Sequence, residues 1–134
     1  MVIESNIYGI KKKVNFTYEE AIEKITNALK EEGFGVLTEI DVQKTLKKKL
    51  DVDFTKYVIL GACNPNLAHM ALTDEIDIGL LLPCNIVVYE NPGDKQVIVA
   101  AVDPAAMIRI TGRSDLDEFA TSVKEKLTRA LEAI

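Results

Sequence analysis

Hydrophobic and polar residues alternate near the start of the chain and then change to helical spacing. Residues 7–16 alternate loosely and predict a first strand, in which Lys12 is the one charged residue on an otherwise apolar face. Thr17 and Glu20 then form a capping box, in which each side chain accepts a backbone N–H of the other residue. The apolar positions that follow keep helical spacing until Gly33, which predicts an amphipathic helix.

The middle of the chain continues this succession of strands and helices. Alternation over residues 34–40 predicts a second strand, and Asp41 is expected to cap a short helix whose narrow apolar seam favours a surface position. A third strand is predicted from Phe54 to about Cys63, because its central residues are branched, bulky and uninterrupted by charge. Asn64-Pro65 combines a strong N-cap with a residue suited to the first helical position, so a third helix is expected directly after this strand.

Turn-forming residues separate two apolar runs in the C-terminal half. Residues 85–90 and 96–102 flank Asn91-Pro92-Gly93-Asp94-Lys95 and predict a β-hairpin. Residues 105–113 stay open between two interpretations, because their isoleucines and methionine favour burial whereas their arginines are free to face an anion or solvent. A cap and acidic residues at 115–118 and an apolar stripe to the last residue predict a final helix. The pattern predicts an α+β two-layer sandwich with five strands, in the order β-α-β-α-β-α-β-β-α.

Length and composition are those of an ordinary globular domain. The 134 residues, 48% hydrophobic and 28% charged, favour a single domain over residues 1–134. The N-terminus lacks the basic and apolar segments of a signal peptide, and no apolar run approaches the ~18 residues of a membrane span. We therefore expect a cytoplasmic protein without membrane partners. The net charge of −5 argues against nucleic-acid binding, which needs a basic surface.

The two cysteines are the leading candidates for chemistry. Cys63 directly precedes the predicted helix N-terminus, whose free N–H groups and dipole lower the pKa of a neighbouring thiol. Cys84 follows Pro83 and opens the next apolar run, so the two cysteines meet at one sheet edge if their strands are antiparallel neighbours. The other interpretation is that both are small buried apolar residues, a common location for free cysteine.

Other catalytic, metal and cofactor sites are disfavoured by residue type and spacing. His69, the only histidine, falls on the polar side of its helix, roughly 7 Å along the axis from the cap. We therefore interpret it as a surface residue beyond hydrogen-bonding reach of Cys63. Two cysteines and one histidine, without a C-x-x-C pair, do not favour a metal site. The chain has neither a G-x-G-x-x-G nor a Walker motif, and no cofactor is expected.

Two motifs carry a family resemblance. Gly-Ala-Cys-Asn-Pro-x-Leu-Ala at 61–68 and Ile-Gly-Leu-Leu-Leu-Pro-Cys-Asn-Ile-Val-Val-Tyr-Glu at 78–90 resemble the signature of an uncharacterised bacterial and archaeal family, domain of unknown function 302. The resemblance implies a small soluble domain, often paired with itself, with a TATA-binding-protein-like fold: a curved, mostly antiparallel sheet with helices on one face. It implies no reaction and assigns no catalytic residue.

Two functional interpretations follow. In the first, the chain is a homodimeric module that binds a small ligand or a partner near the 61–69 turn and the 79–85 loop. The candidate ligand contacts are Cys63, Asn64, His69, Cys84 and Asn85. In the second, the chain is a thiol-dependent redox enzyme or a sulfur carrier that uses Cys63 with Cys84. The lack of general bases favours the first and argues against an enzyme, whereas the helix-terminal cysteine favours the second. Self-association is expected because the hairpin strands are apolar on both faces and helices cover only one.

Overall fold

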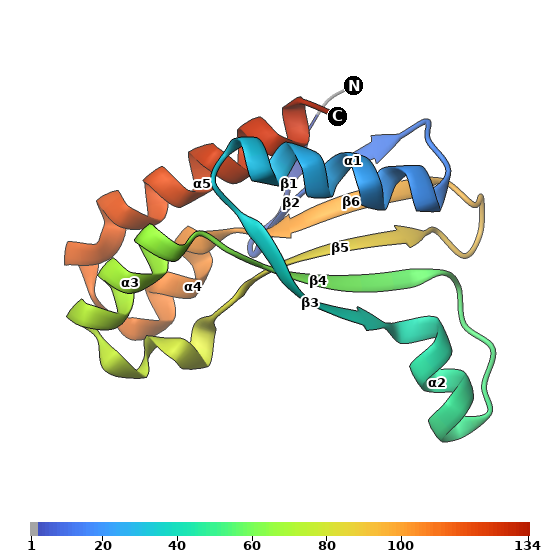
Figure 1. The fold of residues 1–134 in the computed structure, drawn as a ribbon, viewed down its shortest axis with the longest axis horizontal. Coiled ribbons are helices and arrows are strands. Elements are labelled where there is room, and N and C mark those ends of the chain that lie inside the picture. The colour runs from blue at the N-terminus through green and yellow to red at the C-terminus, as the bar shows by residue number, and fades with distance from the viewer. Residues whose placement is uncertain (1–2) are drawn as a thin grey trace.

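The strands of this chain form one sheet of six strands in the computed structural model, which describes residues 3–134 (Figure 1). The order across the sheet is β1-β2-β6-β5-β4-β3, and all neighbouring strands are antiparallel. The strands are β1 (Glu4–Ser5), β2 (Gly9–Val14), β3 (Gly35–Asp41), β4 (Tyr57–Cys63), β5 (Cys84–Glu90) and β6 (Val97–Val102). The predicted α+β class with an antiparallel sheet is therefore confirmed.

The prediction of five strands was wrong, because a short strand, β1, precedes the first predicted one. A tight turn joins it to β2: Asn6 Oδ1 accepts the N–H groups of Tyr8 and Gly9 at 3.0 and 2.8 Å. The Asn6 N–H also donates to the Gly9 carbonyl at 2.9 Å. Two residues of strand are too short to show a period of alternation, so the sequence pattern predicted a strand only from residue 7 and left Glu4–Ser5 outside it.

Five α-helices and two short 3₁₀ helices complete the described chain. They are α1 (Tyr18–Glu31), α2 (Val42–Leu50), α3 (Pro65–Asp74), η1 (Ile76–Leu81), α4 (Pro104–Thr111), η2 (Ser114–Leu116) and α5 (Asp117–Glu132). The capping box before α1 is confirmed, with Thr17 Oγ1 accepting the Glu20 N–H at 3.1 Å. Most of the segment 105–113, for which the sequence left two interpretations, belongs to α4. Helix α5 begins without the expected side-chain cap, because η2 occupies residues 114–116. None of the helices in residues 3–134 has the length and apolar character needed to cross a membrane.

Helices α1 and α5 lie across the same side of the sheet and bury its inward face (Figure 1). Alternate residues of the central strands meet apolar residues of both helices in this core, among them Leu60, Ile86, Val99, Ile25, Leu29 and Leu127. Lys12 points into the same layer and is only 7% exposed. Its Nζ donates to the backbone carbonyls of Leu131, at 3.1 Å, and Ile134. Lys12, the one charged residue on the inward face of β2, therefore caps the C-terminal end of α5.

A second, smaller core lies at the end of the sheet where β4 ends and β5 begins. It joins α3, η1, α4, η2 and the start of α5 through Ala71, Ile78, Ile108, Leu116 and Ala120. Figure 1 shows these helices grouped beyond the strand ends, away from α2 at the far corner. The chain between β4 and β5 thus forms a lobe, made of α3 and η1, beyond the ends of these two strands.

Gly61 lies where β4 passes closest to its neighbours. A Cβ at this position would overlap Thr38 Oγ1, on the cross-strand partner in β3, and would lie 2.8 Å from Pro83 Cγ. We therefore expect Gly61→Ala to lower the free energy of unfolding by about 1–3 kcal/mol, the usual cost of overpacking. Denaturant unfolding followed by circular dichroism measures this change.

Gly35→Ala is the matched control for this experiment. Gly35 lies in β3, the strand paired with β4, but nothing stands within 4 Å of a Cβ built there. We expect its unfolding free energy to stay within about 0.5 kcal/mol of the parent. Adding Thr38→Ala to Gly61→Ala should recover part of the loss. Equal stability of Gly61→Ala and Gly35→Ala would contradict the close approach.

Candidate functional site

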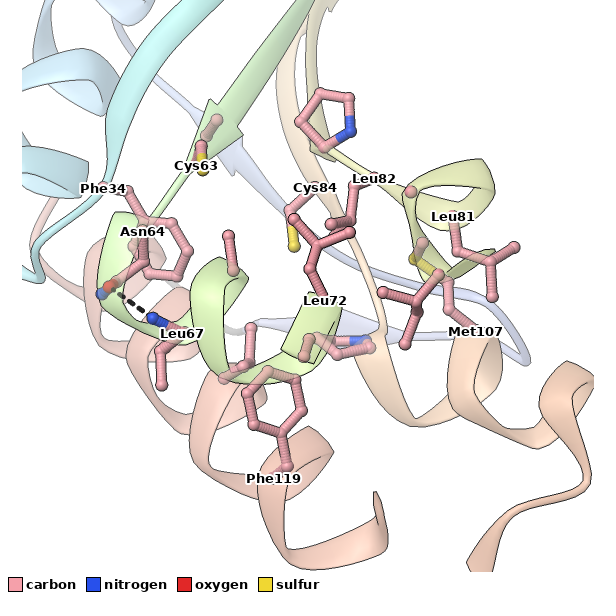
Figure 2. A pocket seen from close by; sticks show the side chains of 18 of the residues that line it. Phe34, Cys63, Asn64, Leu67, Leu72, Leu81, Leu82, Cys84, Met107 and Phe119 are labelled. Atoms are coloured by element: carbon pink, nitrogen blue, oxygen red, sulfur yellow. Dashed lines mark hydrogen bonds between the residues drawn. The ribbon is translucent and has the colours of Figure 1, made fainter. Parts of the chain in front are cut away.

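A cavity of about 390 Å³ opens where the strand ends meet the second core (Figure 2). Side chains from β3, β4, β5, α3, η1, α4 and α5 contribute to it. Large apolar side chains make up most of its wall, including Phe34, Leu67, Leu72, Leu82, Met107 and Phe119. A volume of this size falls within the range of small-molecule sites, roughly 300–1,000 Å³.

The cavity wall holds few polar groups. Thr38, Cys63, Asn64 and Cys84 supply the polar side chains, and no charged side chain is among the described residues that line it. A β-bulge between Val36 and Thr38 inserts Leu37 into β3, and this residue stands at the cavity while 69% exposed. Bulges re-aim side chains next to sites in many sheets. The chemistry of the wall suits an uncharged apolar molecule.

Both candidate cysteines line this cavity. The condition stated for the two cysteines is met, because β4 and β5 are antiparallel neighbours and Ala62 lies opposite Cys84 in their register. Cys63 follows Ala62 at the strand end, so the two thiols reach the cavity from adjacent strands, as Figure 2 shows. Both cysteines are free thiols. Burial raises the pKa of the Cys84 thiol to about 11, and the neighbouring Cys63 adds to this shift.

Asn64 is occupied by contacts within the protein. Its Oδ1 accepts the Leu67 N–H at 3.3 Å and caps α3, the bond drawn in Figure 2. Its Nδ2 donates to the Glu32 carbonyl at 3.4 Å, beside Gly33 in the left-handed conformation (φ 85°) at the end of α1. Asn64 thus ties the end of α1 to the start of α3, and one N–H and one lone pair of its amide are left for other partners.

The remaining two candidate residues lie outside the cavity. His69 is exposed on α3 and does not line it, which agrees with its interpretation as a surface residue. Asn85 is exposed on β5 and instead lines a smaller adjacent hollow. The structure therefore brings Cys63, Asn64 and Cys84 together and separates His69 and Asn85 from them.

Several wall residues had no functional signal in the sequence. Phe34, Leu37 and Phe119 belong to segments far apart in the chain, and ordinary strand or helix patterns account for each of them. Met107 and Ile108 lay in the ambiguous segment, where their need for burial was the one available hint. No group of three or more His, Cys, Asp or Glu residues within 3–134 is placed to hold a metal ion.

Arg113 holds one wall of the cavity in place. Its guanidinium pairs with Asp74 at 2.7 Å, with Glu75 at 3.3 Å and with Asp115 at 2.6 Å. The first two acids lie at the junction of α3 and η1, and the third lies in η2. Arg113 is therefore a structural cation that joins the lobe to the α4–α5 connection. Arg109 is exposed and donates to the Ile7 carbonyl at 3.4 Å.

Fold and site together define a small α+β domain with an apolar cavity at the end of an antiparallel sheet. The chain belongs to the family described as domain of unknown function DUF302, whose model matches residues 10–134. It is similar to a crystal structure of an uncharacterized conserved DUF302 protein from Bacillus stearothermophilus, at 31% identity and a TM-score of 0.88. That likeness covers 96% of this chain and 98% of the other. A search of curated proteins finds no match.

The raised pKa of Cys84 predicts slow alkylation of this thiol in the folded protein. With a pKa of about 11 in place of 9.0, the thiolate fraction at pH 8 falls from about one in ten to about one in a thousand. We expect iodoacetamide to modify Cys84 about 100-fold more slowly in folded than in denatured protein, measured by mass spectrometry of its peptide. Similar rates in both states would contradict the burial of this thiol.

The same shift predicts a loss of stability at high pH. Because the pKa of Cys84 is higher in the folded state, the unfolded state releases this proton first as pH rises above about 9. The contribution of Cys84 to stability is therefore complete below pH 9 and is lost progressively toward pH 11. Cys84→Ala should lack this part of the decline when urea unfolding is compared at pH 8 and pH 10.5.

Proposed function

We propose that this protein binds a small, uncharged, largely apolar molecule in the cavity at the end of its sheet. The observation that carries the proposal is the cavity itself: about 390 Å³ of space with an apolar wall free of charged side chains among the described residues. The cavity opens to the surface, so its apolar wall is in contact with water. An apolar ligand removes this wall and its own apolar surface from water, which is favourable.

The wall also indicates how such a ligand is held. Apolar side chains supply most of the contact area, and the Cys63 and Cys84 thiols and the Thr38 hydroxyl meet the few polar atoms of the ligand. Cys84 is protonated at neutral pH, and burial raises the pKa of its thiol further, so it acts as a small, weakly polar contact. Asn64 supports the site by holding the N-terminus of α3 against the end of α1.

N-phenyl-1-naphthylamine, an uncharged probe that fluoresces in apolar surroundings, tests this function. We expect saturable binding to the parent protein. Ala68→Phe should weaken binding about tenfold or more, because a phenyl ring from α3 then occupies part of the cavity and displaces apolar contacts. Fluorescence titration gives the dissociation constants.

His69→Phe is the matched control for the blocked cavity. It adds a ring of the same size at the next position of α3, where the side chain is exposed and outside the cavity wall. We expect its affinity for the probe to equal that of the parent. Absence of probe binding to the parent, or equal losses in both variants, would refute ligand binding in this cavity.

The second candidate function is thiol chemistry at Cys63 with Cys84 as its partner, in a redox enzyme or a sulfur carrier. One observation favours it, since the two thiols line the same cavity from adjacent strands. The raised pKa of Cys84 opposes it, because the partner thiol also has to react as a thiolate. We therefore place this function second. If the protein works by thiol chemistry, Cys63→Ser should abolish its redox or sulfur-transfer activity. If it works by binding an apolar ligand, the same variant should bind the probe with nearly the affinity of the parent.

We also propose that two copies of the chain pair through the outward face of the sheet. Alternation in the central strands turns Ile59, Val87, Tyr57 and Tyr89 away from α1 and α5, and the two tyrosine rings stack with centroids 5.3 Å apart. These side chains are only half-buried. An isologous pairing of this face would bury them, and twofold dimers are the commonest closed assembly.

Analytical ultracentrifugation tests the pairing. We expect a dimer at micromolar concentration for the parent, and a monomer for Val87→Lys, because a charge in the centre of the face remains solvated only without the partner. His69→Lys introduces the same charge on α3, outside this face, and should remain dimeric. A parent protein that sediments as a monomer would refute the assembly.

A further inference from the structure

The cavity has a smaller neighbour on the side of α4. This second hollow, of about 230 Å³, is lined by Leu80, Asn85 and Val102 together with four residues that also line the main cavity. The shared residues are Leu81, Leu82, Pro83 and Met107. The two hollows therefore lie on either side of one thin wall, formed by the end of η1 and one side chain of α4.

This wall stands at one end of the main cavity. Figure 2 shows Leu81, Leu82 and Met107 together, on the side away from Phe34 and Asn64. Met107 is half-buried, and methionine is unbranched with several freely rotating bonds, so its side chain adapts to a neighbour at low cost. A molecule in the main cavity that displaces the Met107 side chain would therefore reach the second hollow.

The chemistry changes across the wall. The main cavity ends in apolar side chains, whereas the second hollow is bordered by the Asn85 amide, which is exposed on β5. Because Asn85 is exposed at the border of this hollow, its amide is accessible to a polar group placed there. Neither hollow is lined by a charged side chain among the described residues.

We propose that the ligand is an elongated, uncharged amphiphile with an alkyl chain and one polar end. Its chain fills the main cavity and passes Met107 into the second hollow, and its polar end meets the Asn85 amide near the surface. A compact ligand would leave the second hollow empty, whereas a linear one contacts both. This inference rests on the proposed ligand-binding function and names the class of molecule for that site.

A series of straight-chain alcohols from hexanol to dodecanol, measured by isothermal titration calorimetry, tests this class of ligand. Each methylene that enters apolar surroundings raises affinity about fourfold. In the parent protein we expect this increase to continue through the longer alcohols. In Met107→Trp the larger side chain blocks the way between the two hollows, so the increase in affinity should stop at a shorter chain. Met107→Phe serves the same purpose if the tryptophan variant does not fold.

Two further variants locate the ends of the ligand. Met70→Trp makes the same substitution at an exposed position of α3 outside both hollows, and it should keep the chain-length profile of the parent. Asn85→Ala should weaken the longest alcohols about tenfold, the loss of one hydrogen bond to an uncharged group, and leave hexanol unchanged. Circular dichroism establishes that each variant is folded.

The outcomes separate this inference from the function on which it rests. Binding of N-phenyl-1-naphthylamine without binding of any alcohol would overturn the elongated amphiphile and leave the apolar site standing. The same chain-length limit in the parent and in the Met107 variants would also overturn it. Absence of binding by both the probe and the alcohols would refute the site itself.

Discussion

The pairing of β4 with β5 is the constraint on which the rest of this structure depends. Its register places Leu60 opposite Ile86, so the inward positions of both strands share one core beneath α1 and α5. A slip of one residue would turn these side chains to the other face, because strand side chains alternate. The same register sets Ala62 opposite Cys84. Packing of the core thus decides that the two cysteines meet at one end of the sheet.

The position of the cavity follows from this pairing. The chain leaves β4 and returns to β5 at the same end of the sheet, so α3 and η1 stand beyond the strand ends (Figure 1). Helices α4 and α5 form the opposite wall of the cavity. There the buried Asp103 carboxylate accepts the Ala105 N–H at 2.9 Å and pairs with Lys124 at 3.0 Å, so it holds α4 against α5. Arg113 joins the two sides. Each wall is anchored by its own contacts, and the space between them does not collapse.

The apolar walls also decide which chemistry is favourable at the two thiols. Desolvation disfavours a thiolate, as the raised pKa of Cys84 shows, and the same desolvation favours an apolar ligand. The two proposed functions therefore make opposite demands on one environment. A binding site for an apolar ligand gains from walls without charge, whereas thiol exchange needs a nearby base to accept the thiol proton or a cation to stabilise the thiolate. Within the described residues the cavity wall supplies the first condition and lacks the second.

Local signals in the sequence by themselves determined most helices and strands, because a cap or a turn depends on residues only a few positions apart. The Thr17 box, the Asn64-Pro65 start of α3 and the hairpin after residue 90 are of this kind. The sequence also placed two of its candidate contacts, Cys63 and Cys84, on strands that proved to be neighbours. Only the tertiary structure decided that Lys12 caps a helix more than a hundred residues away. It also decided that most of the ambiguous segment 105–113 belongs to helix α4 and that side chains from seven elements line one cavity. The physical reason is that these features depend on long-range register and packing, which no local period of hydrophobic residues encodes.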